Sequence, residues 1–326
     1  MRRSLLLCFS LLLMPGLSAA QAPVVNDITA AQVMLDRLGF SVGEIDGRTG
    51  ANVRRAITAF QQTQGVPTTG LLDAATKQML IELSGEIPPL VSYTVTEADI
   101  KGPFTATIPS DLMEQSKLKA LTYKTPLEAL AEKFHASPAL LQRLNPRARF
   151  DRGGVQLNVP NVAVVEKPAT PARGRGRGRG AEAPVGTTGQ PAVTIYVTKE
   201  TSSLTVEDEA GQVIFHAPVT TGSENDPLPI GTWKVTTVLR NPTFQYNPDL
   251  FWDADPTHAK AKIPAGPNNP VGAVWIDLSK EHYGLHGTPE PSKVGHTQSH
   301  GCVRLTNWDA ERVAQWARAG TPVIFR

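Results

Sequence analysis

The sequence has few cysteines and no long apolar run. Its 326 residues include only two cysteines, Cys8 and Cys302. Cys8 falls within residues 1–20, where two arginines precede a short apolar stretch and small residues follow it, a pattern typical of a cleaved signal peptide. The stretch is well short of the roughly 20 residues that a membrane-spanning helix needs, so we expect no membrane span after cleavage. Cys302 then remains alone, which excludes an internal disulfide.

The sequence also lacks an excess of either charge. It has 32 Lys plus Arg against 30 Asp plus Glu, and removal of the two leader arginines would make the mature chain formally neutral. The overall charge therefore predicts no nucleic-acid partner. Residues 162–190 are rich in Pro and Ala and contain four arginines that alternate with glycine. We interpret them as a disordered linker, with binding of RNA or another anionic polymer as the alternative.

Residues 24–84 have the pattern of a small helical module. Apolar residues recur at intervals of three and four over three stretches, and Asp27 and Asp73 are suitable N-caps for the first and third helices. The order of residues resembles the three-helix peptidoglycan-binding domain attached to many cell-wall enzymes. The motifs that carry this resemblance are Leu38-Gly39-Phe40, Ile45-Asp46-Gly47, Phe60-Gln61 and Thr69-Gly70. The resemblance implies binding to the wall polymer, and the alternative is a generic packing or protein-contact module.

Residues 91–161 predict a small α/β module. Thr125 and Ser137 each precede a proline and open a short helix, and a strand flanks the helix pair on each side. This order is similar to a LysM glycan-binding module. It departs from that family because about thirty residues separate the first strand from the first helix, where the family has only a few. The alternative is an unrelated spacer domain.

Residues 191–326 predict a mainly-β domain with one helix. Short stretches alternate apolar and polar residues, as strands do, and Thr306 with Asp309 forms a helix start. The length suffices for one β-sandwich or partial barrel with its own core. Residues 241–270, rich in Pro and Asp, are expected to form a lid. The fold class that follows is multidomain α+β, with a three-helix module, a small α/β module and a mainly-β domain.

Residues suited to nucleophilic catalysis gather around Cys302. His286 and His300 are close to it in sequence, and a histidine can accept the proton that a cysteine nucleophile must lose. Gly301 lets the chain turn so that backbone amides point at a developing oxyanion. The positive charge of Arg304 suits a substrate carboxylate. This pattern predicts acyl transfer through a thioester.

The same side chains allow a second interpretation. His296, His300 and Cys302 offer three metal ligands, with His286 as a fourth. The helical spacing of His296 and His300 is flanked by Gly295 and Gly301, and no carboxylate that would orient such ligands is evident nearby. We therefore expect no metal and no cofactor.

The cysteine motif resembles the active-site signature of the L,D-transpeptidases, which have a YkuD-type catalytic domain. The matching strings are His286-Gly287-Thr288 and Ser299-His300-Gly301-Cys302-Val303-Arg304-Leu305. Residues 229–233 and 266–272 match further segments of the family. Together these segments cover the predicted domain at residues 191–326.

The resemblance implies a role for each motif residue. Cys302 would be the nucleophile, and His286 would be the base and later the acid, oriented by a backbone carbonyl near Gly287. The other motif residues would shape the site and bind substrate: Ser299 and His300 by holding the cysteine loop, the amides of Gly301 and Cys302 as the oxyanion hole, and Arg304 by contacting a stem-peptide carboxylate.

The resemblance also implies an activity at the cell wall. The enzyme would be exported to the periplasm or cell wall, form an acyl-enzyme with a peptidoglycan tetrapeptide stem, release the terminal D-alanine and transfer the acyl group to an amine. Transfer would give 3-3 cross-links or protein attachment, so the expected partners are stem peptides, glycan and an amine-bearing acceptor protein. Carbapenems should acylate the cysteine.

Two alternatives to the transfer activity remain. One is an L,D-carboxypeptidase or cross-link hydrolase that uses the same cysteine, and the other is a non-catalytic peptidoglycan-binding scaffold. For an exported wall enzyme, the N-terminal modules should raise retention on wall material without altering the chemical step, because tethering raises the local substrate concentration.

Overall fold

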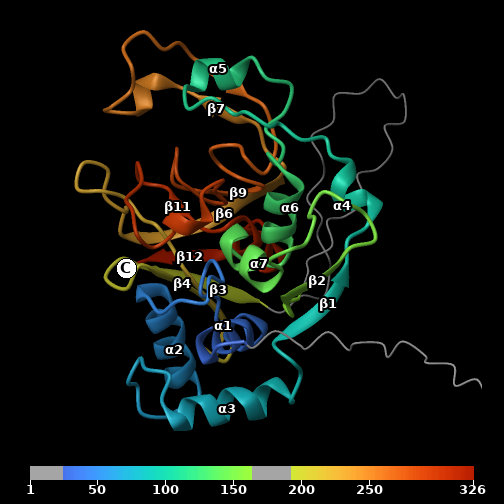
Figure 1. Cartoon of the computed structure of the whole chain (residues 1–326). Coiled ribbons are helices and arrows are strands. Elements are labelled where there is room, and N and C mark those ends of the chain that lie inside the picture. The colour runs from blue at the N-terminus through green and yellow to red at the C-terminus, as the bar shows by residue number, and fades with distance from the viewer. Residues whose placement is uncertain (1–24, 164–191) are drawn as a thin grey trace, which may run out of the picture.

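The structure, a computed structural model, describes residues 25–163 and 192–326. The signal peptide expected at residues 1–20 lies outside the described residues, as do all but the first two residues of the linker expected at 162–190. In the two described ranges, no helix is both long and apolar enough to span a bilayer. The described elements form three segments, which Figure 1 colours from blue to red along the chain.

The first segment contains the three helices that the sequence predicts. They are α1 (Asp27–Arg37), α2 (Ala51–Thr63) and α3 (Ala74–Ser84). The side chain of Asp73 accepts a hydrogen bond from the backbone N–H of Thr76 and caps α3, as predicted. The predicted cap of α1 is wrong by one residue. Asn26 is the N-cap, because its Oδ1 accepts from the backbone N–H of Thr29 at 2.8 Å, and Asp27 is the first helical residue.

The second segment is a two-stranded sheet with helices between its strands. Its elements are β1 (Leu90–Thr94), α4 (Glu97–Lys101), α5 (Leu112–Ser116), α6 (Pro126–Lys133), α7 (Pro138–Leu144) and β2 (Gln156–Pro160). The two strands pair antiparallel, with Leu90 opposite Pro160. Thr125 and Ser137 cap α6 and α7, and a proline follows each cap at the first helical position. The predicted order of strand, two helices and strand is present, with α4 and α5 inserted before the helix pair.

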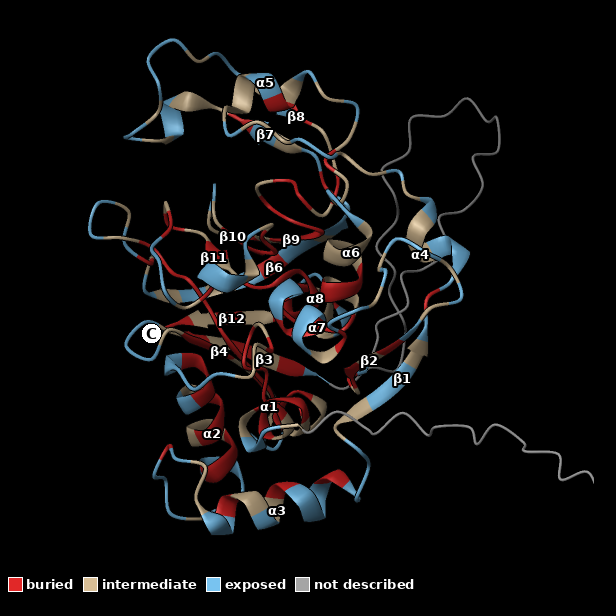
Figure 2. Cartoon of the chain, viewed as in Figure 1, coloured by how far each residue is buried: buried red, intermediate tan, exposed pale blue. Residues whose placement is uncertain are grey.

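The first two segments share one hydrophobic core. Buried Phe60 of α2 belongs to the same cluster as Leu141 of α7 and Leu157 of β2. The backbones are also joined, since the N–H of Ile45 donates to the carbonyl oxygen of His135 at 2.8 Å. Figure 2 shows that α1 is largely buried, whereas α3 and β1 carry many exposed residues. The two segments therefore form one lobe, although the sequence suggests separate modules.

The third segment is built on an eight-stranded mixed sheet. Its strands are β3 (Val193–Thr198), β4 (Ser203–Asp208), β5 (Val213–Pro218), β6 (Gly231–Arg240), β9 (Val274–Leu278), β10 (Gly284–His286), β11 (Val303–Arg304) and β12 (Pro322–Phe325), in the order β11-β10-β9-β6-β12-β3-β4-β5. After β5 the chain returns to β11, where Thr220 and Arg304 exchange two backbone hydrogen bonds of 3.0 and 2.9 Å. The two edges of the sheet meet there, so the sheet approaches the predicted partial barrel.

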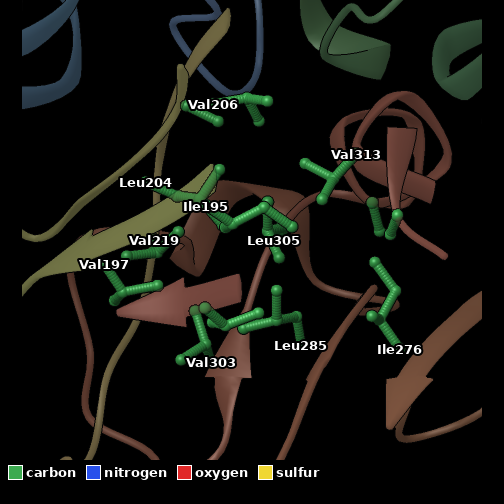
Figure 3. Packing of buried hydrophobic residues seen from close by; sticks show 14 of the residues in the cluster. Ile195, Val197, Leu204, Val206, Val219, Ile276, Leu285, Val303, Leu305 and Val313 are labelled. Carbon is green, nitrogen blue, oxygen red and sulfur yellow. The ribbon is translucent and has the colours of Figure 1, made fainter. Parts of the chain in front are cut away.

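The core of this segment lies between the sheet and one helix. α8 (Asn307–Trp316) begins at the predicted cap, Thr306, whose side chain accepts from the backbone N–H of Asp309. Ile195, Leu285 and Val313 are fully buried in this core, and Figure 3 shows them among the side chains that converge between the strands and the helix. Full burial of each such side chain is worth about 1.5–3 kcal/mol. This packing holds β10 and β11, the strands that flank the candidate site.

A small additional core joins the second and third segments. The hairpin of β7 (Phe244–Tyr246) and β8 (Ala261–Ile263), with the 3-10 helix η1 (Pro248–Leu250) between its strands, forms a lobe that Figure 1 shows on the far side of the sheet from α1–α3. Tyr246 and Ile263 of this hairpin pack with Leu121, which follows α5. A Cβ on Gly266 would lie 2.1 Å from the carbonyl oxygen of Leu121, so the two backbones touch. The insertion that departs from the LysM pattern is therefore the part that packs on the predicted lid.

The first segment also covers the β5 edge of the sheet. Phe40 forms a parallel bridge with His216. The N–H of Ser41 donates to the carbonyl oxygen of His216 at 2.8 Å, and the N–H of His216 donates to the carbonyl oxygen of Gly39 at 2.8 Å. Gly39 has a φ of 89°, and a Cβ there would lie 2.8 Å from a backbone oxygen of β5. An uncovered edge strand is open to pairing with other chains, and this contact closes it.

Candidate active site

Cys302 lies directly before β11, which pairs with the strand that carries His286. β10 and β11 are parallel, with His286 opposite Arg304. The thiol is half-buried, and its Sγ donates to the carbonyl oxygen of His282 at 3.6 Å. His282 has a φ of 65°, which is uncommon outside glycine, and this turn precedes β10. The sheet thus places the motif histidine on the strand next to the one that the motif cysteine precedes.

The thiol of Cys302 is held in its protonated form. Burial raises its pKa above the ordinary value, because the thiolate would lose its contact with water. Two groups act in the opposite direction and lower the pKa: the backbone N–H of Gly284, which hydrogen-bonds to the sulfur, and the positive charge of Arg304. A thiol in this state needs a base before it can act as a nucleophile.

His286 has the protonation state of such a base. The side chain is 3% exposed, and its ring stacks on Trp275 with the ring centroids 5.4 Å apart. Its Nδ1 lies 2.6 Å from the carbonyl oxygen of Gly287. Because a carbonyl oxygen only accepts, Nδ1 carries the hydrogen and Nε2 keeps its lone pair. Burial and, next, the charge of Arg304 lower the pKa of His286 to about 3, so the imidazole is neutral at physiological pH.

Asn307 packs against Gly287, the residue whose carbonyl oxygen orients His286. A Cβ on Gly287 would lie 2.2 Å from Oδ1 of Asn307, so only glycine fits there. That Oδ1 accepts from the backbone N–H of Ala273 at 2.9 Å, and Nδ2 donates to a carboxylate oxygen of Glu132 at 2.8 Å. The first residue of α8 is therefore held in place directly beside Gly287.

The loop before Cys302 is fastened at Ser299 and Gly301. Oγ of Ser299 donates to the carbonyl oxygen of Cys302 at 2.6 Å, and its N–H donates to the carbonyl oxygen of Thr221 at 2.9 Å. Gly301 has a φ of 98°, and a Cβ there would lie 2.7 Å from the ring of Tyr283. These are the contacts of loop-holding residues, the role that the resemblance implies for Ser299.

His300 connects the cysteine loop to the predicted lid. Its Nε2 lies 2.8 Å from Oδ1 of Asp253. The His300 ring also meets the ring of Phe251 edge-on at 5.2 Å, and the ring of Trp252 lies 6.1 Å away. These partners follow η1, within the segment expected to be a lid. The imidazole of His300 is therefore engaged with that segment.

Arg304 lies on β11 beside the thiol and a small cleft. Burial lowers the pKa of its guanidinium, while the negative charges of a Cys302 thiolate and of Glu290 raise it. With Thr288 and Thr297, among others, Arg304 lines a cleft of about 20 Å³. A guanidinium in this position can form a bidentate pair with a carboxylate.

The metal interpretation finds no geometric support in the described ranges. Within residues 25–163 and 192–326, no group of three or more His, Cys, Asp and Glu side chains is arranged to hold a metal ion. His300, one of the ligands in that interpretation, pairs with Asp253. A cavity of about 660 Å³ lies elsewhere, between α6 and α8, and neither Cys302 nor His286 lines it.

Three residues of this site were not predicted from the sequence, namely Tyr283, Asn307 and Asp253. Tyr283 stands just before the motif strand, so its place in the sequence was a usable signal. The sequence shows only that Asn307 follows a predicted helix cap, which gives no indication of its contact with Gly287. Asp253 is one of several aspartates in residues 241–270, and nothing local distinguishes it.

Comparison with known proteins adds a family assignment to this geometry. Residues 192–325 match the family model described as "L,D-transpeptidase catalytic domain", and residues 25–80 match "Putative peptidoglycan binding domain". The "Putative L,D-transpeptidase YkuD" of Bacillus licheniformis is 47% identical over 57 residues, which are 18% of this chain and 34% of that protein. The "Probable L,D-transpeptidase YbiS" of Escherichia coli is 26% identical over 205 residues, which are 61% of this chain and 60% of that protein.

Among solved structures, an L,D-transpeptidase from Mycobacterium smegmatis overlaps 42% of this chain and 59% of its own chain, at 19% identity and a TM-score of 0.34, which is too low to carry an inference. The chain thus spans 34% to 60% of the length of these relatives. The LysM interpretation of residues 91–161 stays a prediction. The two other resemblances are confirmed: the chain contains a YkuD-type L,D-transpeptidase catalytic domain at residues 192–325 and a peptidoglycan-binding domain at residues 25–80.

Proposed function

We propose that the protein is an exported cysteine L,D-transpeptidase that acts on peptidoglycan stem peptides. The observation that carries the proposal is that Cys302 directly precedes β11, the strand that pairs in parallel with the strand of His286, while the imidazole is neutral with its hydrogen on Nδ1. A thiol with a raised pKa requires a base, and a histidine with a free Nε2 lone pair can supply one. The family assignment supports peptidoglycan as the substrate class.

The first half of the reaction forms a thioester. Sγ of Cys302 attacks the carbonyl carbon of the amide that follows the third residue of the stem peptide, while Nε2 of His286 takes the thiol proton. The amides of Gly301 and Cys302 stabilise the oxyanion of the tetrahedral intermediate. When the intermediate collapses, the C–N bond breaks, His286 returns the proton to the leaving amine, and D-alanine departs.

The second half transfers the acyl group to an amine. The acceptor nitrogen attacks the thioester and gives its proton to His286, and the thiolate leaves and is protonated again. Arg304 would hold a carboxylate of the stem peptide during both halves. An amine of a second stem peptide gives a 3-3 cross-link, an amine of a protein gives covalent attachment, and water gives the carboxypeptidase or hydrolase product.

The other segments support action at the wall. The peptidoglycan-binding domain at residues 25–80 would retain the enzyme on the polymer. Residues 91–161 would add glycan binding as a LysM-like module, which the antiparallel β1–β2 pair and the helix pair α6–α7 before β2 support. The leader at residues 1–20 supports export to the periplasm or cell wall.

Intact mass and product analysis test the proposal. The chain lacking residues 1–20 is incubated with a carbapenem, and separately with a disaccharide tetrapeptide, beside a Cys302→Ala control. We expect a covalent adduct and a dimeric 3-3 product for the wild type, and neither for the variant. An adduct with tripeptide as the only product would indicate the carboxypeptidase. Absence of any adduct would overturn the enzyme proposal in favour of a binding scaffold.

A further inference from the structure

The peptidoglycan-binding segment contacts the loop that leads to Cys302. Asn52, near the start of α2, is 9% exposed, and its Nδ2 donates to the carbonyl oxygen of Val294 at 2.9 Å. Val294 is itself 1% exposed and ends the 3-10 helix η2 (Pro291–Lys293). The bond is therefore buried at both ends, where an unpartnered carbonyl would cost about 1–3 kcal/mol.

A second contact continues the first along the loop. Arg55, one turn after Asn52, donates from one guanidinium nitrogen to Oδ1 of Asn52 at 2.6 Å and to the carbonyl oxygen of Gly295 at 3.3 Å. A Cβ on Gly295 would lie 2.4 Å from Oδ1 of Asn52, and Gly295 has a φ of 77°. Helix and loop are so close here that only glycine fits between them.

The far side of the same loop is bonded to the catalytic strand. The N–H of Gly295 donates to Oγ1 of Thr220 at 3.0 Å, and Thr220 in turn exchanges two backbone hydrogen bonds with Arg304. Farther along, Ser299 is bonded to the carbonyl oxygens of Thr221 and Cys302. A continuous set of hydrogen bonds therefore runs from α2 through the loop to the nucleophile.

We infer that Asn52 is a positioning residue for the cysteine loop, so that the peptidoglycan-binding segment contributes to the acylation step and not only to retention on the wall. The inference rests on the proposed function. It differs from the expectation that the N-terminal modules leave the chemical step unchanged. The structural reason is that α2 fixes the start of the loop on one side while the strand carrying Arg304 fixes it on the other.

The test compares Asn52→Ala and Asn52→Asp with a matched control in the same helix. Asn52→Asp keeps the shape and the acceptor for Arg55 but removes the N–H that Val294 accepts. The control is Gln61→Ala, because Gln61 is a fully buried amide of α2 whose bonds go to residues 69–76 of its own segment. Each full-length mature protein is treated with a carbapenem over a range of concentrations, and the acylation rate constant at saturation is measured by intact mass.

For the Asn52 variants we expect the saturating acylation rate to fall about tenfold, as a small displacement of a reacting group does, with the half-saturating concentration little changed. Gln61→Ala should lower the melting temperature and leave the rate within about twofold of wild type. Wild-type rates in both Asn52 variants, or an equal loss in Gln61→Ala, would overturn the inference.

A second readout separates the inference from the proposed function. If the wild type formed no carbapenem adduct, the proposed function would fail, and the alkylation rate of Cys302 by iodoacetamide would then report on the loop. A rate altered about threefold or more by both Asn52 variants and unaltered by Gln61→Ala would support the positioning role. Equal alkylation rates in all four proteins would overturn it.

Discussion

Gly301 and Tyr283 pack so closely that no side chain can be added at the glycine. A Cβ on Gly301 would lie 2.7 Å from Cε1 of the tyrosine ring. The glycine also has a φ of 98°, a conformation that residues with a side chain rarely adopt. The close contact with Tyr283 and the positive φ therefore both require glycine in the turn that precedes Cys302. Substitutions at this glycine and at a second glycine can separate the two effects.

Gly301→Ala should reduce acylation far more than it reduces stability. The positive φ costs about 1–2 kcal/mol, and the contact with Tyr283 displaces the adjacent Cys302, the proposed nucleophile, for which we expect a loss of about 100-fold in acylation rate. Gly320→Ala is the matched control, because Gly320 has a φ of 93° with no atom within 4 Å of its added Cβ. Melting curves and carbapenem acylation check both variants. A similar loss of activity in the two would contradict the role of the Tyr283 contact.

Arg304→Met should make the Cys302 thiol less reactive at a given pH. The charge of Arg304 lowers the pKa of this thiol, which burial raises, so removing the charge raises the pKa further. At any pH below that pKa the thiolate fraction then falls, about tenfold for each pH unit by which the pKa rises. The alkylation rate by iodoacetamide between pH 7 and 10 measures this displacement. Arg304→Lys keeps the charge and should follow the wild type, and coincident profiles for wild type and Arg304→Met would contradict the assignment.

The proposed catalytic pair could be named from the sequence because short strings carry both residues. Cys302 and Gly301 stand side by side in one motif, and His286 opens another, so their types and spacing were enough. The helix caps Thr306 and Asp73 could be predicted for the same reason, since a cap depends on the next three residues. The error at Asp27 is of this local kind, because the neighbouring Asn26 offers the same chemistry.

The contacts between segments could not be predicted. Asn52 bonds to Val294, and Ser41 bonds to His216 and to Asp309, across sequence separations that no periodicity spans. From the sequence alone, a polar residue on a helix, such as Asn52, is expected to be exposed to solvent. Its burial becomes evident only when the surface against which the helix packs is known. The packing of the insertion around Leu121 could not be predicted either, because the residues that it contacts lie far along the chain, in the hairpin at residues 244–263.

The pair of His300 and Asp253 should matter more for the mobility of the predicted lid, residues 241–270, than for stability. Both side chains are partly exposed, so the pair is worth at most about 1 kcal/mol. In Asp253→Asn we therefore expect a nearly unchanged melting temperature, faster tryptic cleavage after Lys262 and acylation slowed about threefold, as expected when a loop that closes a site is loosened. Asp249→Asn, in an exposed pair of the same lobe, is the control. Equal cleavage rates in the two variants would argue against a link through His300.

A buried carboxyl at the junction of the segments should make stability depend on pH. Asp309 is 0% exposed, and burial, followed by the nearby charge of Asp36, raises its pKa to about 7. Its Oδ2 accepts from Oγ of Ser41 at 2.9 Å and from Oγ1 of Thr306 at 2.7 Å. Both bonds need only an acceptor, so an asparagine oxygen can replace it.

Asp309→Asn should therefore stabilise the protein at high pH and lose this advantage at low pH. The pKa of Asp309 is about 7 when folded and about 3.9 when unfolded, so the folded state binds the proton more tightly. The stabilisation from the protonated form is complete below about pH 4 and is lost as the pH rises through 7. The variant never acquires this charge. The free energy of unfolding of the variant, relative to that of the wild type, should therefore rise from pH 5 to pH 8 by an amount on the order of 2–4 kcal/mol, and its relative melting temperature should rise with it. His216 and His286, whose pKa values burial lowers to about 4 and about 3, titrate in both proteins and largely cancel in the difference. A difference in melting temperature that stayed constant over this range would show that Asp309 is ionised in the folded protein throughout.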